Sequence, residues 1–203
     1  MKNIFYIILS FSALSLNSCN NTVEKEDDAP VEKPGEEYKL DVEKSQIRWF
    51  GEKIKNGKVD GSHNGTLQLK SGSINMDNSI ITGGEFVIDM QTIKEDGKDL
   101  DRDMTAKLVG DLKSEDFFET DKYPTASLKI NSGTKESIQG TLTVKGVELE
   151  VDIPVTMTFG DKNIIVGAVF DLDFTPFKIP ALGGDGEYIS NKIGFRVYLD
   201  FIK

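Results

Sequence analysis

The sequence has little of the chemistry that catalytic and metal sites usually need. Its 203 residues include one cysteine, Cys19, and one histidine, His63. A lone cysteine cannot form an internal disulfide, so the folded part must be held together by its hydrophobic core. Zinc sites need several His or Cys ligands, and nucleophilic triads need a histidine beside the nucleophile. We therefore expect no metal, no cofactor and no catalytic residue.

His63 precedes Asn64-Gly65, a dipeptide typical of turns, and nothing around it resembles a nucleophile motif. We interpret it as a histidine at a turn or strand end. An enzyme that depends on His63 is retained only as a third hypothesis about function.

Basic residues are outnumbered by acidic ones. The chain has 24 Lys and Arg against 34 Asp and Glu, a net charge of −10. Nucleic acid and anionic lipid headgroups are bound by basic surfaces, so this balance argues against both as partners.

Long apolar runs are absent as well. Residues 4–16 are mostly apolar, but a transmembrane helix needs about 20 such residues.

The N-terminus has the organisation of an export signal. Lys2 precedes the apolar run, which ends in Leu16-Asn17-Ser18-Cys19. This ending resembles the lipobox of bacterial lipoproteins, which implies cleavage of a signal peptide, residues 1–18, and a lipid on the Cys19 thiol. Residues 19–37 are then the lipidated cysteine and a flexible acidic linker. We expect a lipid-anchored protein of the cell envelope, on the periplasmic face or the cell surface.

Residues 38–203 are enough for one domain with a single core. Their main pattern is an alternation of apolar and polar residues, which predicts strands with one buried face. The longest case covers residues 147–159, where seven apolar residues occupy every second position. About eight strands joined by short turns predict an all-β fold, an antiparallel β-barrel or sandwich.

One segment has a helical period. Leu100, Met104, Leu108 and Leu112 recur every four residues, which predicts an amphipathic helix over residues 99–113. The aspartates at 99, 101 and 103 have the opening spacing of a calcium loop. Met104 stands where such a loop requires glycine, and Gly110 where it requires glutamate, so the helix is favoured.

Residues 112–126, with Asp116-Phe117-Phe118 followed by Lys122-Tyr123-Pro124, resemble the most distinctive stretch of the YceI-like family. Residues 38–41, 84–90 and 140–147 resemble other segments of that family in the same order. Residues 49–53 and 171–176 depart from its usual pattern. The resemblance implies a lipocalin-like β-barrel with a helix beside it. It also implies that an apolar lipid, a polyisoprenoid or isoprenoid quinone, is held inside.

The inward-facing residues of such a barrel would bind the ligand, and an apolar loop after residue 175 would form a rim or lid. The predicted lining residues are Trp49, Phe86, Ile88, Leu128, Leu142, Val144, Val151, Ile153, Phe170, Phe195 and Val197, with Phe177, Ile179 and Leu182 at the rim. Filled and hollow barrels show the same alternation. A filled barrel acting as a structural or interaction lipoprotein is therefore the alternative to a lipid carrier. Whether the chain forms a homodimer is left open.

Overall fold

The computed structural model describes residues 35–97, 100–179 and 187–203, and the predicted signal peptide, Cys19 and most of the predicted linker lie outside these ranges. The elements are β1 (Glu36–Leu40), β2 (Gln46–Lys55), β3 (Lys58–Asp77), β4 (Ile80–Glu95), α1 (Arg102–Lys113), β5 (Thr125–Gly133), β6 (Ser137–Val144), β7 (Val147–Pro154), β8 (Thr156–Phe159), β9 (Asn163–Asp173), the 3-10 helix η1 (Thr175–Phe177), β10 (Glu187–Ile189) and β11 (Lys192–Ile202).

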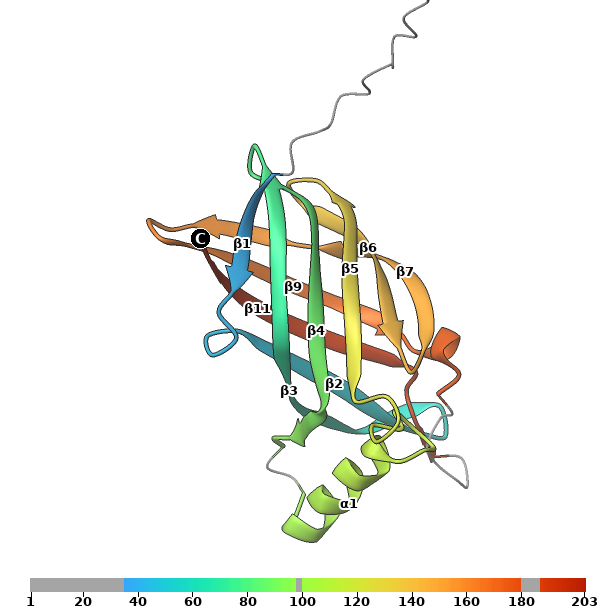
Figure 1. Ribbon diagram of the computed structural model, residues 1–203. Coiled ribbons are helices and arrows are strands. Elements are labelled where there is room, and N and C mark those ends of the chain that lie inside the picture. Colours follow the sequence, from blue (N-terminus) through green and yellow to red (C-terminus); the bar gives the residue numbers. More distant parts are fainter. Residues whose placement is uncertain (1–34, 98–99, 180–186) are drawn as a thin grey trace, which may run out of the picture. The chain divides into compact units, whose positions relative to one another are not determined.

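All strands belong to one antiparallel sheet, which confirms the predicted all-β class. The order across it is β7, β6, β5, β4 and β3, then β1 and β2 in one row, then β11 and β9. β1 and β2 share a row because the long β3 pairs with β1 through residues 73–76 and with β2 through residues 58–67. The rows number eight, as the sequence predicted. Figure 1 shows the curled sheet, with α1 below one end and the β3–β4 turn at the other.

The predicted strand over residues 147–159 is instead two strands. β7 pairs with β6 as far as Pro154, and β8 then pairs with β9. Proline has no N–H for a ladder, so it ends a paired strand readily. The amide of Val155 donates instead to the carbonyl of Glu136, at 2.8 Å. The alternation of side chains continues through the break, so the alternation alone predicted one continuous strand in spite of Pro154.

The predicted helix is confirmed with a later start. α1 begins at Arg102, and the Asp101 carboxylate caps it by accepting from the Met104 amide at 2.8 Å. This capping explains one of the three aspartates that resembled a calcium loop. Leu112 is buried and Leu108 half-buried, but Met104 is 56% exposed. The prediction that Met104 lies on the buried face of the helix is therefore wrong. Among the described residues, no helix has the length and apolarity to cross a membrane.

The turn expected at Asn64-Gly65 is also absent, because β3 runs straight through it. His63 pairs with Gly51 inside the β2–β3 ladder, so it lies neither at a turn nor at a strand end. Gly65 is required for space. A Cβ there would lie 1.7 Å from the Lys94 carbonyl oxygen and 2.8 Å from the Trp49 ring. The glycine allows two neighbouring strands and an indole to approach closely.

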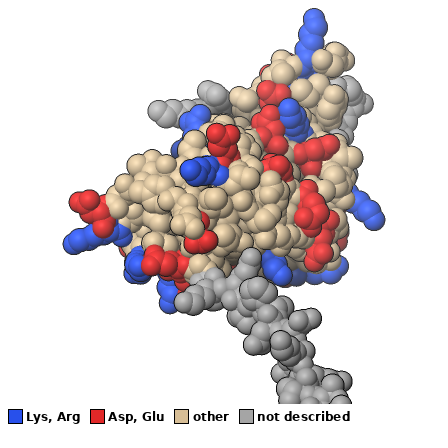
Figure 2. Space-filling model, turned by 90° about the horizontal axis from the view of Figure 1, so that it is seen from above, with Lys and Arg blue, Asp and Glu red and all other residues tan. Residues whose placement is uncertain are grey.

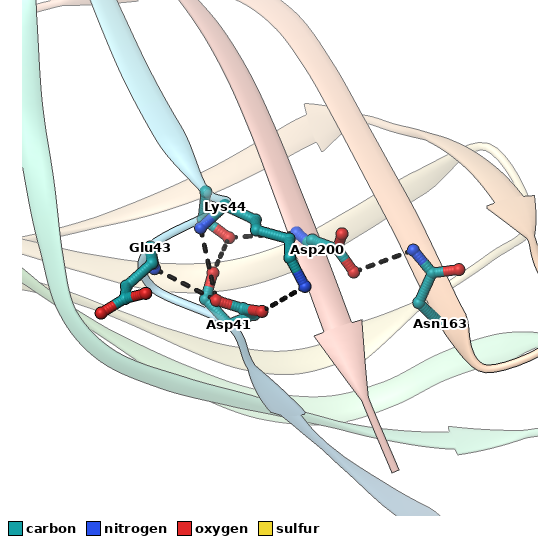
Figure 3. Close-up of polar contacts among 6 residues, drawn as sticks. Asp41, Glu43, Lys44, Asn163 and Asp200 are labelled. Carbon is teal, nitrogen blue, oxygen red and sulfur yellow. Dashed lines mark hydrogen bonds and ion pairs between the residues drawn. The ribbon is translucent and has the colours of Figure 1, made fainter.

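β1 begins at Glu36, two residues before the expected start of the domain at residue 38, because Glu36 and Glu37 pair with Met76 and Asn75 of β3. The loop after β1 is fixed to β11 by a polar network (Figure 3). Its amide hydrogen bonds run from Asp41 to the Asp200 carbonyl, at 2.8 Å, and from Asp200 to the Ser45 hydroxyl, at 3.0 Å.

Candidate ligand-binding cavity

The sheet curls around an apolar cavity of about 350 Å³. Its walls come from β2, β3, β4, β5, β6, β7, β9 and β11, so every row of the sheet contributes. The alternation seen in the sequence explains this, since successive side chains of a strand point to opposite faces of the sheet. Several inward-facing residues, among them Ile88, Leu128 and Val197, are only half-buried. They border open space inside the barrel.

Ten of the eleven predicted lining residues border this cavity, and whether they bind a ligand stays a prediction. They are Phe86, Ile88, Leu128, Leu142, Val144, Val151, Ile153, Phe170, Phe195 and Val197. The eleventh, Trp49, lies outside it. Trp49 lines a smaller cavity of about 60 Å³ nearer α1, together with His63, and its indole N–H donates to the Lys94 carbonyl at 3.1 Å.

A group of phenylalanines separates the two cavities at the α1 end. Phe118 and Phe174 meet edge to face with ring centres 5.9 Å apart, and Phe174 lies 6.1 Å from Phe195. Phe195 in turn stacks on Phe170 at 5.5 Å. Phe118, Phe174 and Phe195 line both cavities, so they form a shared floor. Aromatic pairs at these distances add about 0.5–1.5 kcal/mol each beyond the area they bury.

Phe118 is positioned by the segment that resembled the YceI-like family. Phe117, beside it in the sequence, is buried, and the two rings meet edge to face at 4.6 Å. The Lys145 ammonium, from the β6–β7 turn, donates to the carbonyls of Glu115 and Phe117 at 2.9 and 3.0 Å. The double-phenylalanine turn is thereby fastened to the barrel wall, and Phe118 faces inward.

The opposite end of the cavity is closed by tightly packed residues. Phe201 is fully buried, and Ile74 and Ile81 are each 1% exposed. Phe201 also meets Phe86 edge to face with ring centres 6.0 Å apart. Neither end of the barrel is open, as far as the described residues show.

The predicted rim residues occupy a different environment from the one expected. Phe177 is 1% exposed and Ile179 is 5% exposed, so both belong to the core. Phe177 lies in η1, and its ring is 5.4 Å from Phe174 beneath the cavity floor. Leu182, the third predicted rim residue, lies outside the described residues. An apolar loop next to a strand is ambiguous from sequence, because a lid and a buried plug have the same composition.

Sequence reasoning missed three groups of cavity residues. The largest consists of further inward-facing strand residues, such as Leu67 and Leu199, which the same alternation could have found. Phe118 and Phe174 belong to the floor, and Phe118 could have been found from the double-phenylalanine motif. The third group is acidic: Glu150, Asp152 and Asp171 border the cavity although their alternation places them on the outer face. Period-two patterning assigned these three to solvent, and no sequence signal placed them near a cavity.

The chemistry available to the cavity is that of apolar binding. Its interior is formed almost entirely by aliphatic and aromatic side chains. Within residues 35–97, 100–179 and 187–203, no group of three or more His, Cys, Asp or Glu is arranged to hold a metal ion. Figure 2 shows charges of both signs scattered among uncharged surface at the end seen from above, without a continuous basic field.

A curled antiparallel sheet around an apolar cavity, with a helix beside one end, defines a lipocalin-type fold. The sequence model of the YceI-like domain matches residues 38–201, and the chain belongs to that family. A search of curated proteins gave no significant match.

Among solved structures, BcnA from Burkholderia cenocepacia superposes with a TM-score of 0.62 at 18% identity, covering 79% of this chain and 98% of that one. A YCEI protein from Campylobacter jejuni gives a TM-score of 0.48 at 16% identity, covering 66% and 83%. At 18% identity, the structural similarity to BcnA establishes only the fold of this chain.

Proposed function

We propose that this protein is a non-catalytic carrier that holds a long apolar lipid inside its barrel at an envelope membrane. The observation that carries the proposal is the apolar cavity of about 350 Å³. Ligand sites in proteins span about 300–1,000 Å³ and are mostly apolar. The cavity argues against the alternative of a filled barrel with a purely structural role. The family resemblance adds the ligand class, a polyisoprenoid or an isoprenoid quinone.

Energetics set a minimum length for such a ligand. Each buried CH₂ contributes about 0.8 kcal/mol, and association costs about 4 kcal/mol or more. Micromolar affinity corresponds to about −8 kcal/mol. About 15 apolar carbons are therefore needed to reach it without polar contacts. The cavity volume lies at the lower end of the usual range. A much longer chain would therefore leave part of its length outside.

The anchor proposed at Cys19 would keep the carrier beside the membrane that supplies its ligand. A diacylglyceryl group carries two acyl chains, and two chains give stable attachment where one gives only reversible binding. About 18 residues separate the anchor from the domain, an extended reach of at most ~65 Å. The protein would then collect and release lipid within that distance of the bilayer.

The direct test is organic extraction and native mass spectrometry of the full chain carrying Cys19→Ser, purified without detergent. We expect a co-purifying apolar lipid. The matched variants are Leu128→Trp and Lys129→Trp, which are neighbours on β5. Leu128 faces the cavity and Lys129 is exposed outside. The inward tryptophan should fill the cavity and abolish the bound lipid, whereas the outward one should leave it unchanged. Loss of lipid in both variants, or in neither, would contradict the proposal.

A further inference from the structure

The barrel wall is interrupted between β7 and β9. In the described part of the chain, β7 pairs along one edge only, with β6. β9 pairs with β11 along its full length, and on its other edge β8 covers only residues 164–167. From Ala168 to Asp173 the edge of β9 that faces β7 has no strand partner. A closed barrel continues its ladder around the whole circumference, so this is the point where the wall opens.

Side chains on the two edges show that the cavity reaches the outside here. Leu149 of β7 and Phe170 of β9 point inward, line the cavity and are only half-buried. Glu150 and Asp171 point outward and are exposed, yet they border the same cavity. On the other rows of the described sheet the residues that border the cavity are inward-facing, so outward-facing neighbours of the cavity are found at these two edges. Because both ends of the barrel are packed, the lateral opening is the direct route to the cavity.

The edge of this opening is acidic. Glu150 and Asp152 stand on β7, and Asp171 stands opposite on β9. The ion pair at the opening joins Asp171 to Lys192 at 3.1 Å, and both side chains are more than half exposed. Exposed pairs of this kind contribute little, because solvent screens them. The remaining contacts are neutral: Thr141 donates to Glu150 at 2.7 Å and Gln139 donates to Asp152 at 3.4 Å. Three carboxylates against one ammonium leave the opening negative.

We propose that the lipid passes sideways between β7 and β9, and that its polar end stays at this opening and carries no negative charge. An alcohol, an amide or a quinone ring suits such a site, because each can accept or donate hydrogen bonds without repelling carboxylates. A phosphate or carboxylate headgroup would lie beside three like charges. This inference rests on the proposed function and narrows the ligand class from polyisoprenoid lipids in general to those with an uncharged polar end.

The headgroup test compares geranylgeraniol with geranylgeranyl phosphate, which share one tail. Each is offered in phosphatidylcholine vesicles to the full chain carrying Cys19→Ser. We expect the alcohol to bind at least 10-fold more tightly than the phosphate at low salt, and the preference to shrink at 0.5 M NaCl as the charges are screened. Replacing the three carboxylates at the opening together, Glu150→Gln, Asp152→Asn and Asp171→Asn, should bring the two affinities within 3-fold by improving phosphate binding alone.

The matched control removes three exposed carboxylates elsewhere: Asp77→Asn, Glu85→Gln and Asp121→Asn. It changes the net charge equally, so it corrects for general repulsion between an acidic protein and vesicles that carry phosphate. An equal gain in phosphate binding in this control would overturn the headgroup inference, as would equal affinities in the unmodified protein. If neither lipid binds, the proposed function itself fails, which is a distinguishable result.

The route is tested with a second pair of variants on β9. Ala168 faces the cavity at the opening, whereas Val169 points outward and is 68% exposed. Ala168→Phe should slow both uptake and release of geranylgeraniol at least 5-fold, measured as transfer between donor and acceptor vesicles, while Val169→Phe should leave both rates unchanged. Unaltered transfer rates in Ala168→Phe would show that lipid enters elsewhere.

Discussion

Two glycines show how differently the same residue type can be constrained. Gly65 of β3 has the Lys94 carbonyl and the Trp49 ring where a Cβ would lie, whereas Gly110 of α1 has nothing within 4 Å. We expect Gly65→Ala to separate β3 from β4 locally and to cost about 3 kcal/mol or more, as severe overpacking does. Gly110→Ala should stabilise the protein by up to about 1 kcal/mol, since alanine favours the helix. Urea unfolding of both variants measures the difference.

Asp200 is a buried charge with a defined partner. It is 5% exposed, and its carboxylate accepts a hydrogen bond from the Asn163 amide at 3.0 Å (Figure 3). Asp200→Ala would leave that donor without its partner, and we expect a loss of about 1–3 kcal/mol in unfolding free energy. Asp200→Asn keeps an accepting oxygen and should retain most of the stability. Equal losses in the two variants, measured in denaturant, would show that the hydrogen bond contributes little.

At the scale of elements, β10 is a three-residue strand that pairs with β2 and carries two ion pairs to it. The Lys53 and Lys55 ammonium groups contact Glu187 at 2.6 and 2.5 Å, and their hydrogen bonds lower the pKa of Glu187 from 4.5 to about 2. A lowered carboxyl pKa stabilises the folded state above the ordinary pKa, and this contribution disappears as pH falls through the folded value. The attachment of β10 should therefore weaken between about pH 4.5 and pH 2.

Hydrogen exchange of the β10 amides across that pH range tests the attachment. Protection should fall with acidification in the unmodified protein. Glu187→Gln should show low protection at every pH, because the amide cannot form the ion pairs. A pH profile that the variant shares with the unmodified protein would assign the loss to another group.

The elements most accessible to sequence reasoning were those whose pattern has one physical cause. Alternation along β6 and β11 predicted the sheet, and the four-residue recurrence that ends at Leu112 predicted the helix, because burial of one face is a local requirement. The break at Pro154 depends on which neighbour each half of the strand joins, and that is a long-range choice. The role of Gly65 depends on an indole and a carbonyl contributed by two other strands, so turn chemistry was the wrong explanation.

The candidate site was predictable to the same extent. Inward-facing residues such as Phe86, Leu142 and Val197 follow from alternation, and their place in the cavity wall required only that the sheet curl. The hollow itself could not be derived, because it depends on side-chain volumes across the barrel. The alternation assigned Glu150 and Asp171 to solvent. Their relation to the cavity exists only because β7 and β9 fail to pair.

At the scale of the whole molecule, ligand binding should raise the free energy of unfolding. A lipid that binds only the folded state raises the unfolding free energy by about 2.7 kcal/mol at a concentration of 100 times its Kd. We expect geranylgeraniol to raise the thermal midpoint of the chain carrying Cys19→Ser in proportion to the logarithm of its concentration. Leu128→Trp should remove that dependence, and Lys129→Trp should keep it. Calorimetry of the three proteins side by side makes the comparison.

The proposed anchor gives a prediction at the same scale. Cys19→Ser removes the thiol that would accept the lipid, so the full chain expressed in a bacterial host should carry no lipid. Metabolic labelling with a radioactive fatty acid should mark the unmodified chain and leave the variant unlabelled. Labelling of the serine variant would place the lipid on another residue.

The opening between β7 and β9 has a further consequence for how copies of the protein meet. An edge strand with free hydrogen-bonding groups is a template on which a second copy can add a strand. Between residues 148 and 154, the outward side chains of β7 are Glu148, Glu150, Asp152 and Pro154. If two such edges paired in antiparallel fashion, the three carboxylates of one copy would lie near those of the other and repel them. Pro154 has no backbone N–H to donate to the pairing. Glu150 and Asp152, two of the residues proposed to select the cargo, should therefore also oppose aggregation through the exposed edge of β7.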